Sequence, residues 1–500
     1  MKKAPALVVL AALAVALFAV PSSQAQTLPL LAIGTLDQTS AGSFVDLSGL
    51  TYPLENLVPA NSLGGFGSAI AYASGNTFLA LPDRGPNAVT FDAAIDNTAS
   101  YVNRFHTITM MLEPNTSGSG LPFTLTPKMR QTTLLWSHTP LVYGTGSGLG
   151  VGPGAPPINN SLQNFFTGRS DNFDPAQNSG NPNDARFDSE GMRLSNDGRH
   201  IFISDEYGPY VYEFDRFTGK RTRSFQLPES FFVTTLSPVG ANELANTAGR
   251  VDNKGMEGLA ITPDGRTLVG IMQNSLIQDG GSKGKLLRIV TMGIECGCTT
   301  HQYGYVLTNG SGVSEIVAVN DHQFLVDERD GNGRESGGDD VTKGNAAVVK
   351  QLFMINLNGA TDISGLDTGA MTLAEATQAA VPKKPFLVDI VASLTAASLG
   401  PNAVAATNIP AKIEGVAFGP DLKEKDCTPE IWDHFWKHHE KKDDFGKSDN
   451  VIHTLWIAND NDFLQMVVDP NGNQIPNPNQ FFVFGFTDDD LPGFVPQKFE

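Results

Sequence analysis

The stretch NKGMEGLAITPDGRTLVGIMQN, residues 253–274, contains a unit from which the architecture can be predicted. Glu257 precedes a short apolar run, a Pro-Asp-Gly turn follows, and a second apolar run ends in polar residues. Proline, aspartate and glycine favour tight turns, and apolar runs on both sides of such a turn are typical of a β-hairpin. The stretch therefore predicts two antiparallel strands with a carboxylate at the start of the first.

The same unit recurs along the chain, and the repetition predicts the architecture. Further copies read GFGSAIAYASGNTFLALPDRG (65–85), DSEGMRLSNDGRHIFISDE (188–206), VSEIVAVNDHQFLVDERDG (313–331) and KIEGVAFG (412–419), the last of which continues as LWIANDND (455–462). Small antiparallel sheets repeated around an axis form a β-propeller. We therefore expect an all-β fold, a β-propeller with six blades, five or seven being the alternatives.

The first residues predict export. Lys2 and Lys3 precede an apolar run, and Ser23-Gln24-Ala25 is a small-x-small cleavage site, so residues 1–25 are expected to be a secretory signal peptide. No later segment has a long uninterrupted apolar run. The mature chain is therefore expected to be soluble, without a membrane span, and located in the periplasm or outside the cell.

Residues 26–500 are expected to fold as one domain and to act as a monomer. A loop rich in Gly, Asn and Pro is inserted at 137–185, and a charged segment at 422–450 interrupts the last repeat. Long loops of this kind are usually functional or mobile. Strands at 30–36 and 481–486 could pair, which would close the ring with both ends of the chain in one blade.

Charge and cysteine content narrow the function. The net charge is -19, which argues against nucleic-acid binding because that requires a basic surface. An acidic exported protein could instead hold divalent cations, or the acidic residues could serve only solubility. The three cysteines are Cys296, Cys298 and Cys427. They predict one disulfide with one thiol left over, and the pairing stays open.

The repeated glutamates form the main candidate site. The inner strands of a propeller line its axis, so glutamates at the starts of these strands converge on one region. One copy has Ser68 at this position, and the others have Glu190, Glu257, Glu315 and Glu414. Carboxylates crowded near an axis repel each other unless a cation or a positively charged partner neutralises them. A single glutamate could cap a turn or pair with an arginine, but four in register favour a functional acidic ring.

Polar residues that follow the second strand of each copy add possible metal ligands. Besides the four glutamates, the candidate metal ligands are Asp205, Glu206, Asp327, Glu328, Asp460 and Asp462, and Asp83, Gln273, Asn274, Asp330 and Asn459 offer further oxygens. Calcium takes roughly six to eight oxygen ligands, whereas zinc prefers histidine and cysteine. We therefore expect Ca²⁺, with another divalent cation as the alternative. Arg84, Lys254 and Arg329 could hold a substrate phosphate, or each could form an ordinary ion pair.

Several blocks, taken in order, resemble one known family. FDSEG, FISDEYGPYVYEFD, NKGMEGLAITPDG, FLVDERDG, QLFMINLNGATDIS, KIEGVAFGPD and LWIANDNDF resemble the phytase-like family, also described as having the "esterase-like activity of phytase". The resemblance runs over roughly residues 60–487. It implies a secreted or periplasmic β-propeller linked to ester or phosphoester hydrolysis. Ser68 and the charged insertion depart from the pattern.

The first functional hypothesis is metal-dependent hydrolysis of a small-molecule phosphoester. Phosphoryl transfer needs charge neutralisation and an oriented water. In this hypothesis Glu190 and Glu257 take part in catalysis, and Arg84, Lys254 and Arg329 contact the phosphate.

Two alternatives stay open. The first is a carboxylesterase or lactonase on a propeller. Residues 280–284 match the G-x-S-x-G pattern around Ser282, but a nucleophile elbow requires a strand before the motif and a helix after it. The second alternative is a non-enzymatic propeller that binds a ligand or a protein.

Overall fold

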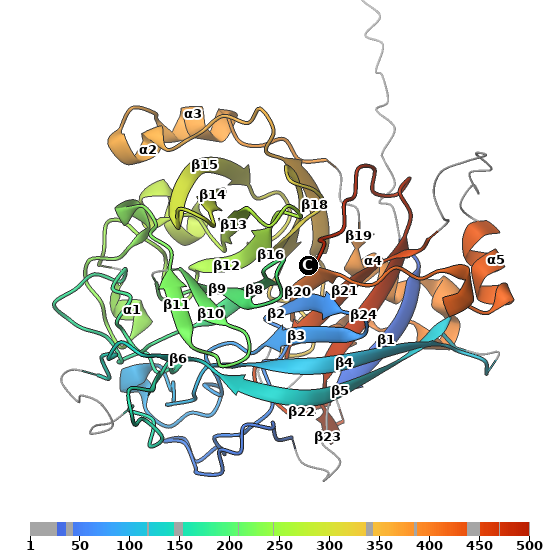
Figure 1. The fold of residues 1–500 in the computed structure, drawn as a ribbon, viewed down its shortest axis with the longest axis horizontal. Coiled ribbons are helices and arrows are strands. Elements are labelled where there is room, and N and C mark those ends of the chain that lie inside the picture. Colours follow the sequence, from blue (N-terminus) through green and yellow to red (C-terminus); the bar gives the residue numbers. More distant parts are fainter. Residues whose placement is uncertain are drawn as a thin grey trace, which may run out of the picture.

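The chain folds as a β-propeller with five blades in this computed structural model (Figure 1). The structure describes residues 28–36, 44–117, 120–144, 154–208, 210–243, 245–336, 344–384, 388–437, 451–469 and 471–499. Within these residues the strands form five four-stranded sheets whose neighbouring strands are antiparallel. The predicted all-β propeller is confirmed. Its blade number is five, the lower of the two alternatives to six.

Each blade runs from an inner strand at the axis to an outer strand at the rim. Blade 1 is β2 (Ala69–Ser74), β3 (Thr77–Leu81), β4 (Arg104–Pro114) and β5 (Phe123–Leu134); blade 2 is β8 (Ser189–Leu194), β9 (His200–Asp205), β10 (Val211–Asp215) and β11 (Arg221–Ser224). Blade 3 is β12 (Met256–Ile261), β13 (Thr267–Met272), β14 (Leu286–Gly293) and β15 (Cys298–Val306); blade 4 is β16 (Gly312–Ala318), β17 (Gln323–Arg329), β18 (Lys350–Asn356) and β19 (Val388–Asp389). Blade 5 is β20 (Lys412–Phe418), β21 (His453–Asp460), β24 (Asn479–Phe486) and β1 (Leu30–Leu36).

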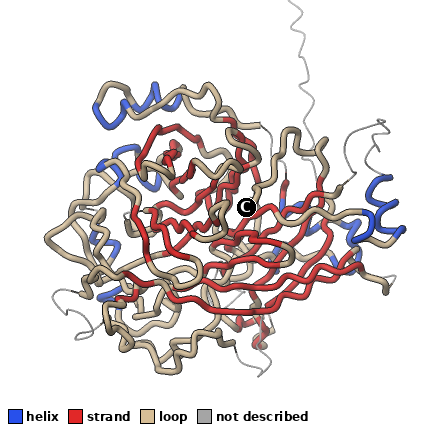
Figure 2. Tube along the Cα trace, viewed as in Figure 1, coloured by secondary structure: helices blue, strands red, loops and turns tan. Residues whose placement is uncertain are grey.

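The remaining elements are short, and the helices lie at the periphery (Figure 2). The helices are α1 (Gly240–Glu243), α2 (Gly365–Thr368), α3 (Leu373–Gln378), α4 (Ile390–Thr395) and α5 (Pro429–Lys437). Two small two-stranded sheets pair β6 (Trp136–Ser137) with β7 (Asn164–Phe165) and β22 (Met466–Val468) with β23 (Gln474–Pro476).

The glycine after the repeated glutamate lets the inner strands pack closely. Each inner strand contacts the inner strands of both neighbouring blades. A Cβ atom at Gly191 would lie 2.7 Å from the backbone nitrogen of Leu259, and one at Gly258 would lie 2.8 Å from that of Ile316. These distances are too short for a side chain, so the Glu-Gly pair combines a carboxylate with the close strand approach that the axis requires.

The two ends of the chain share blade 5, as the sequence predicted. β1 pairs antiparallel with β24, with Ala32 opposite Val483 and Leu36 opposite Asn479. The first described strand is thus hydrogen-bonded to the last. Blade 5 thus combines one strand from the start of the chain with three strands from its end, and this pairing closes the ring of blades.

The hydrophobic core is divided into layers between consecutive blades. Between blades 1 and 5, for example, the rings of Phe78 and Trp456 lie 4.6 Å apart between centroids. Comparable clusters fill the spaces between blades 1 and 2, 2 and 3, 3 and 4, and 4 and 5. Both faces of the inner and middle strands are buried in this way, which explains why their sequences read as continuous apolar runs.

The cysteines, the helices and the two insertions were also subjects of sequence predictions. Cys296 and Cys298 form a disulfide, and Cys427 is free. No helix within the described ranges is long and apolar enough to cross a membrane. Residues 1–25 lie outside the described residues, as do 145–153 of the first insertion and 438–450 of the second.

Candidate functional site

The repeated glutamates stand at irregular points in the inner strands. The strand pairing shifts register between Ser189 and Met192, between Met256 and Gly258, between Val313 and Glu315, and between Ile413 and Gly415. A β-bulge locally breaks the alternation of side chains and redirects one of them. The bulges therefore explain how strands that pack mainly against apolar neighbours can direct a glutamate side chain elsewhere.

The first acidic cluster lies at the start of β8 and the end of β9, beside the start of β12. Asp188, Glu190 and Glu206 are buried, and one carboxylate oxygen from each lies within 4.8 Å of the others. The neighbouring Glu257 accepts a hydrogen bond at Oε1 from Gln273 Nε2 (2.8 Å), while its buried Oε2 has no hydrogen-bond partner. Burial raises the pKa of Glu257 well above its usual value, and Glu206 raises it further.

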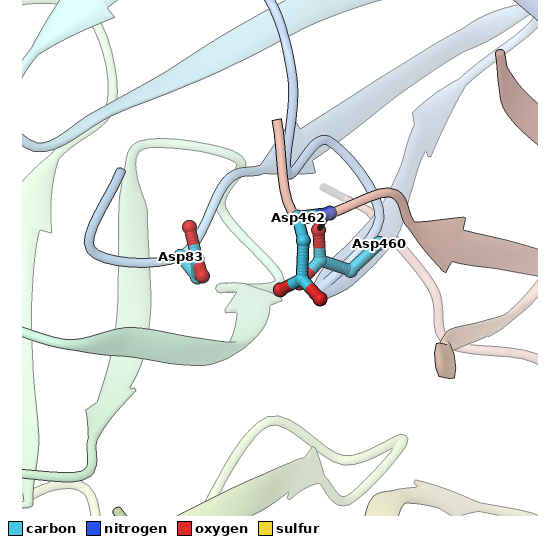
Figure 3. A group of neighbouring side chains, drawn as sticks. All are labelled: Asp83, Asp460 and Asp462. Atoms are coloured by element: carbon cyan, nitrogen blue, oxygen red, sulfur yellow. Dashed lines mark hydrogen bonds between the residues drawn. The ribbon is translucent and has the colours of Figure 1, made fainter. Parts of the chain in front are cut away.

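The second acidic cluster lies between blades 1 and 5. Asp460 is the last residue of β21, Asp462 lies two positions later, and Asp83 approaches them from the loop after β3 (Figure 3). Lys412 Nζ lies 2.9 Å from Asp460 Oδ2 and 2.5 Å from Asp462 Oδ1. One lysine therefore neutralises part of a cluster that carries three carboxylates.

Glu414 connects the two clusters. Arg329 Nη2 lies 2.5 Å from Glu414 Oε1 and 3.5 Å from Glu257 Oε1. Burial raises the pKa of Glu414 to about 7, although Arg329 and Lys412 lower it. On the other side of the axis, Arg84 forms an ion pair with Asp188.

These groups form one acidic ring at one end of the axis. Its carboxyl groups are Asp83, Asp188, Glu190, Glu206, Glu257, Glu414, Asp460 and Asp462, and its cationic side chains are Arg84, Lys254, Arg329 and Lys412. The pKa values of Glu190 and Glu206 are raised, first by burial and then by neighbouring carboxylates. The carboxyl groups outnumber the cationic side chains in the described residues, so either bound protons or a bound cation must offset the repulsion among them.

Four of the predicted metal ligands are not part of the acidic ring, and their surroundings differ from it. Glu315 accepts hydrogen bonds from the amides of Leu259 (3.1 Å) and Ile316 (2.9 Å) and pairs with Arg193 (2.9 Å). Asp205 accepts hydrogen bonds from the amides of Asp188, Tyr207 and Gly208. Both residues therefore hold the fold together, and we leave them out of the ring.

The other two predicted ligands are neighbours on β17. Glu328 forms an ion pair with Lys383 and accepts hydrogen bonds from Tyr305 and from loop amides. Asp327 is fully buried with no hydrogen-bond partner for either oxygen, and burial raises its pKa to about 8 despite Arg329 and Lys350. Glu328 is thus structural, whereas Asp327 is an additional acceptor next to the ring.

Three important residues were missed by the sequence reasoning. Asp188 lies two positions before Glu190, and the period of a strand puts such a pair on one face, so the DSEG motif carried a usable signal. Lys412 similarly precedes Glu414 by two positions. Arg193 gave no local signal, because its role depends on strands of three other blades that meet its own strand at the axis.

The three predicted phosphate contacts differ in how directly they reach the acidic ring. Arg84 and Arg329 reach the ring directly, and Lys254 donates a hydrogen bond to Gln273 Oε1 (3.2 Å), which in turn binds Glu257 through its Nε2. Ser282, by contrast, is exposed in a short 3₁₀ turn at Gly281–Lys283 that leads into β14. This geometry is not the strand-turn-helix arrangement of a nucleophile elbow.

Comparisons with known proteins complete the description of the site. The model of the phytase-like family, "Esterase-like activity of phytase", matches residues 61–432. An "Uncharacterized secreted protein" of Arthroderma benhamiae is 31% identical over 179 residues, a match that covers 29% of this chain and 35% of the relative. The chain therefore matches about a third of the length of that curated relative.

Two solved structures show a weak overall similarity. A putative 6-phosphogluconolactonase from Bacteroides uniformis has a TM-score of 0.28 at 10% identity and covers 82% of this chain and 83% of its own. A structure described as the Dos1 propeller has a TM-score of 0.25 at 10% identity and covers 67% and 72%.

Proposed function

The chain belongs to the phytase-like family, and from this membership and the acidic ring we propose that it is a metal-dependent hydrolase of small phosphoesters. One observation carries the proposal. Asp188, Glu190 and Glu206 hold carboxylate oxygens within 4.8 Å of one another, and the neighbouring Glu257 has a buried Oε2 without a partner. Like charges held this closely in a buried site are expected where a cation completes them.

The donor set fits a hard divalent cation. Asp188, Glu190, Glu206 and Glu257 would hold it, and all of them offer oxygen. Calcium prefers oxygen ligands and tolerates irregular geometry, so we propose Ca²⁺ first. A cation bound there would supply charge neutralisation for a phosphoryl group.

The chain's own residues supply the remaining functions. Arg329, between Glu257 and Glu414, and Arg84, beside Asp188, are placed to orient phosphoryl oxygens by charge-assisted hydrogen bonds. Glu414, with a pKa raised by burial to about 7, is suited to hold or release a proton near neutral pH. Burial of the ring strengthens each of these interactions relative to water.

We extend the proposal to the place where the protein acts. The signal peptide predicted at 1–25 supports export, and the relative from Arthroderma benhamiae is itself described as secreted. Export gives access to calcium at concentrations that weak extracellular sites require, on the order of 10⁻⁴–10⁻³ M.

The test is hydrolysis of phenyl phosphate and of phenyl acetate by the purified protein, first with Ca²⁺ and then with a chelator. We expect phosphate release that is lost on chelation and restored by added Ca²⁺. Glu229→Gln, an exposed carboxylate outside the ring, serves as the matched control and should behave as the wild type.

Two other results would overturn the proposal. Cleavage of phenyl acetate alone, surviving chelation, would point to a metal-free esterase. Binding of Ca²⁺ without turnover of either ester would point to a binding propeller.

A further inference from the structure

A polar pocket adjoins the acidic ring at Arg84. Its volume is about 250 Å³, and its wall includes Arg84, Asp96, Arg186, Tyr207, Glu243 and Asp252. These residues come from the loops after β3 and β9, from the residue that follows the insertion at 137–185, and from α1 and the segment between it and β12. The pocket is therefore built by connections between blades, where substrate specificity commonly resides.

Arg84 and Tyr207 belong to both the pocket and the edge of the ring. The Arg84 side chain donates to Asp188 on the ring side and to Asn253 on the pocket side. Tyr207 interacts electrostatically with Arg84 and Asp188 on one side and with Arg186 and Asp252 on the other. A molecule in the pocket would thus lie directly beside the proposed phosphate contact.

The pocket wall offers an unused donor and an unused acceptor. Arg186 is 2% exposed, its Nη1 donates to the carbonyl of Ser170 (3.3 Å), and its Nη2 has no hydrogen-bond acceptor. The carboxylate of Asp252 receives no hydrogen bond from any residue that the structure describes. A ligand hydroxyl can both accept from an arginine and donate to a carboxylate, so hydroxyl groups suit this pair.

Two aromatic rings and a carboxylate hold the Arg186 guanidinium in place. The Arg186 guanidinium lies 4.8 Å from the centroid of the Tyr207 ring and 4.7 Å from that of Phe173. Its carboxylate partner Glu243 lies 3.6 Å away and also pairs with Arg250 (2.7 Å). The donor is therefore held rigidly before any ligand arrives, which reduces the entropy that binding must overcome.

Size and charge limit what the pocket accepts. The pocket is smaller than the roughly 300–1,000 Å³ typical of sites for drug-sized ligands. Of the charged groups in the wall, Arg84 pairs with Asp188 and Arg186 pairs with Glu243. Asp96 and Asp252 then leave an excess of carboxylates, which would repel a second phosphate. A compact, uncharged, hydroxyl-rich group fits both constraints.

We propose that this pocket binds the hydroxylated leaving group of a singly phosphorylated sugar or sugar alcohol, with Arg84 meeting the phosphate at the pocket edge. The inference rests on the proposed phosphoester hydrolysis and deepens it by naming the substrate class. It also predicts selection against the same sugar carrying a second phosphate.

The test compares kcat/KM for glucose 6-phosphate, glucose 1,6-bisphosphate and phenyl phosphate in wild type, Asp252→Asn and Ala241→Phe. Ala241 is an exposed residue of the pocket wall, so a phenylalanine at this position adds bulk at the pocket without altering a charge. We expect each variant to lower the ratio of kcat/KM for glucose 6-phosphate over phenyl phosphate at least tenfold, as loss of a charge-assisted hydrogen bond or of space would. Glu229→Gln should leave the ratio unchanged.

A binding measurement separates this inference from the proposed function. Saturation-transfer NMR with glucose, which carries no phosphate, should show binding to wild type and its loss in both variants. If no ester is hydrolysed but glucose binds in this way, the pocket stands and the hydrolase proposal fails. If hydrolysis occurs with unchanged ratios in both variants, if the bisphosphate matches the monophosphate, or if glucose does not bind, the pocket inference is overturned.

Discussion

Glu257 lies where the two parts of the acidic ring meet. One oxygen is shared between Gln273 and Arg329, while the other is buried and unpartnered. Glu257→Gln keeps the shape and removes the charge, and its amide cannot serve as an anionic ligand. We expect Ca²⁺ affinity to fall at least tenfold, measured by isothermal titration calorimetry, with phosphatase activity falling in parallel.

Thermal unfolding of the metal-free variant supplies the structural control. Removing one of several crowded buried carboxylates relieves repulsion, so the apo variant should be at least as stable as the apo wild type. Equal Ca²⁺ affinity in Glu257→Gln and wild type would remove this residue from the cation site.

Arg193 links the inner strands of four blades at the axis of the propeller. Its guanidinium donates to the carbonyls of Ile70, Met192, Ile316 and Val416, which belong to four different blades. It also pairs with Glu315 at 2.9 Å. One side chain therefore satisfies the inward carbonyls where a propeller has no further strands to do so.

This arrangement predicts strong destabilisation by Arg193→Met. The variant leaves Glu315 as a buried carboxylate without its partner, a loss that is typically about 3–5 kcal/mol in free energy of unfolding. Urea unfolding would measure it, and the double variant with Glu315→Gln should recover part of the loss. Independent, additive effects of the two substitutions would show that the pair is not coupled.

At the scale of elements, the Glu-Gly pair links the site to the fold. Gly258→Ala would place a Cβ atom 2.8 Å from the backbone nitrogen of Ile316, forcing β12 and β16 apart. We expect about 1–3 kcal/mol of destabilisation in urea unfolding, as for other overpacked positions. Gly331→Ala, where a Cβ atom would meet nothing within 4 Å, is the matched control and should change stability by less than about 0.5 kcal/mol. Equal effects at the two positions would contradict the close-approach explanation.

The strands and their pairing could be predicted from the sequence, but the division into blades could not. The repeated hairpins and the pairing of the first strand with the last were read correctly, because strand period and turn chemistry are local signals. The observed five blades were one of the predicted alternatives, and six was expected first because the count depended on how the regions between copies were divided. The sequence could not distinguish Glu328 from Asp327: adjacent strand residues face opposite ways, and Glu328 pairs with Lys383 while Asp327 lies near the ring.

At the scale of the whole molecule, the ring couples protonation to stability. Glu414 and Asp327 have pKa values raised by burial to about 7 and about 8, whereas carboxyl groups of an unfolded chain titrate near about 4. Between these values the metal-free folded protein holds protons that the unfolded chain has released. Its free energy of unfolding must therefore fall as pH rises from about 4 to about 8.

Calcium should oppose this loss, because a cation that binds ionised carboxylates replaces the protons that the folded state otherwise retains. We expect urea unfolding with a chelator to show declining stability across this pH range. With Ca²⁺ the decline should be flattened or reversed, and the gain should be largest at the alkaline end. In Glu257→Gln the gain should be much smaller at every pH. If the curves with and without Ca²⁺ were parallel, the titrating carboxyl groups would not be ligands of a cation. The acidic ring would then only bind protons, within a propeller that binds ligands.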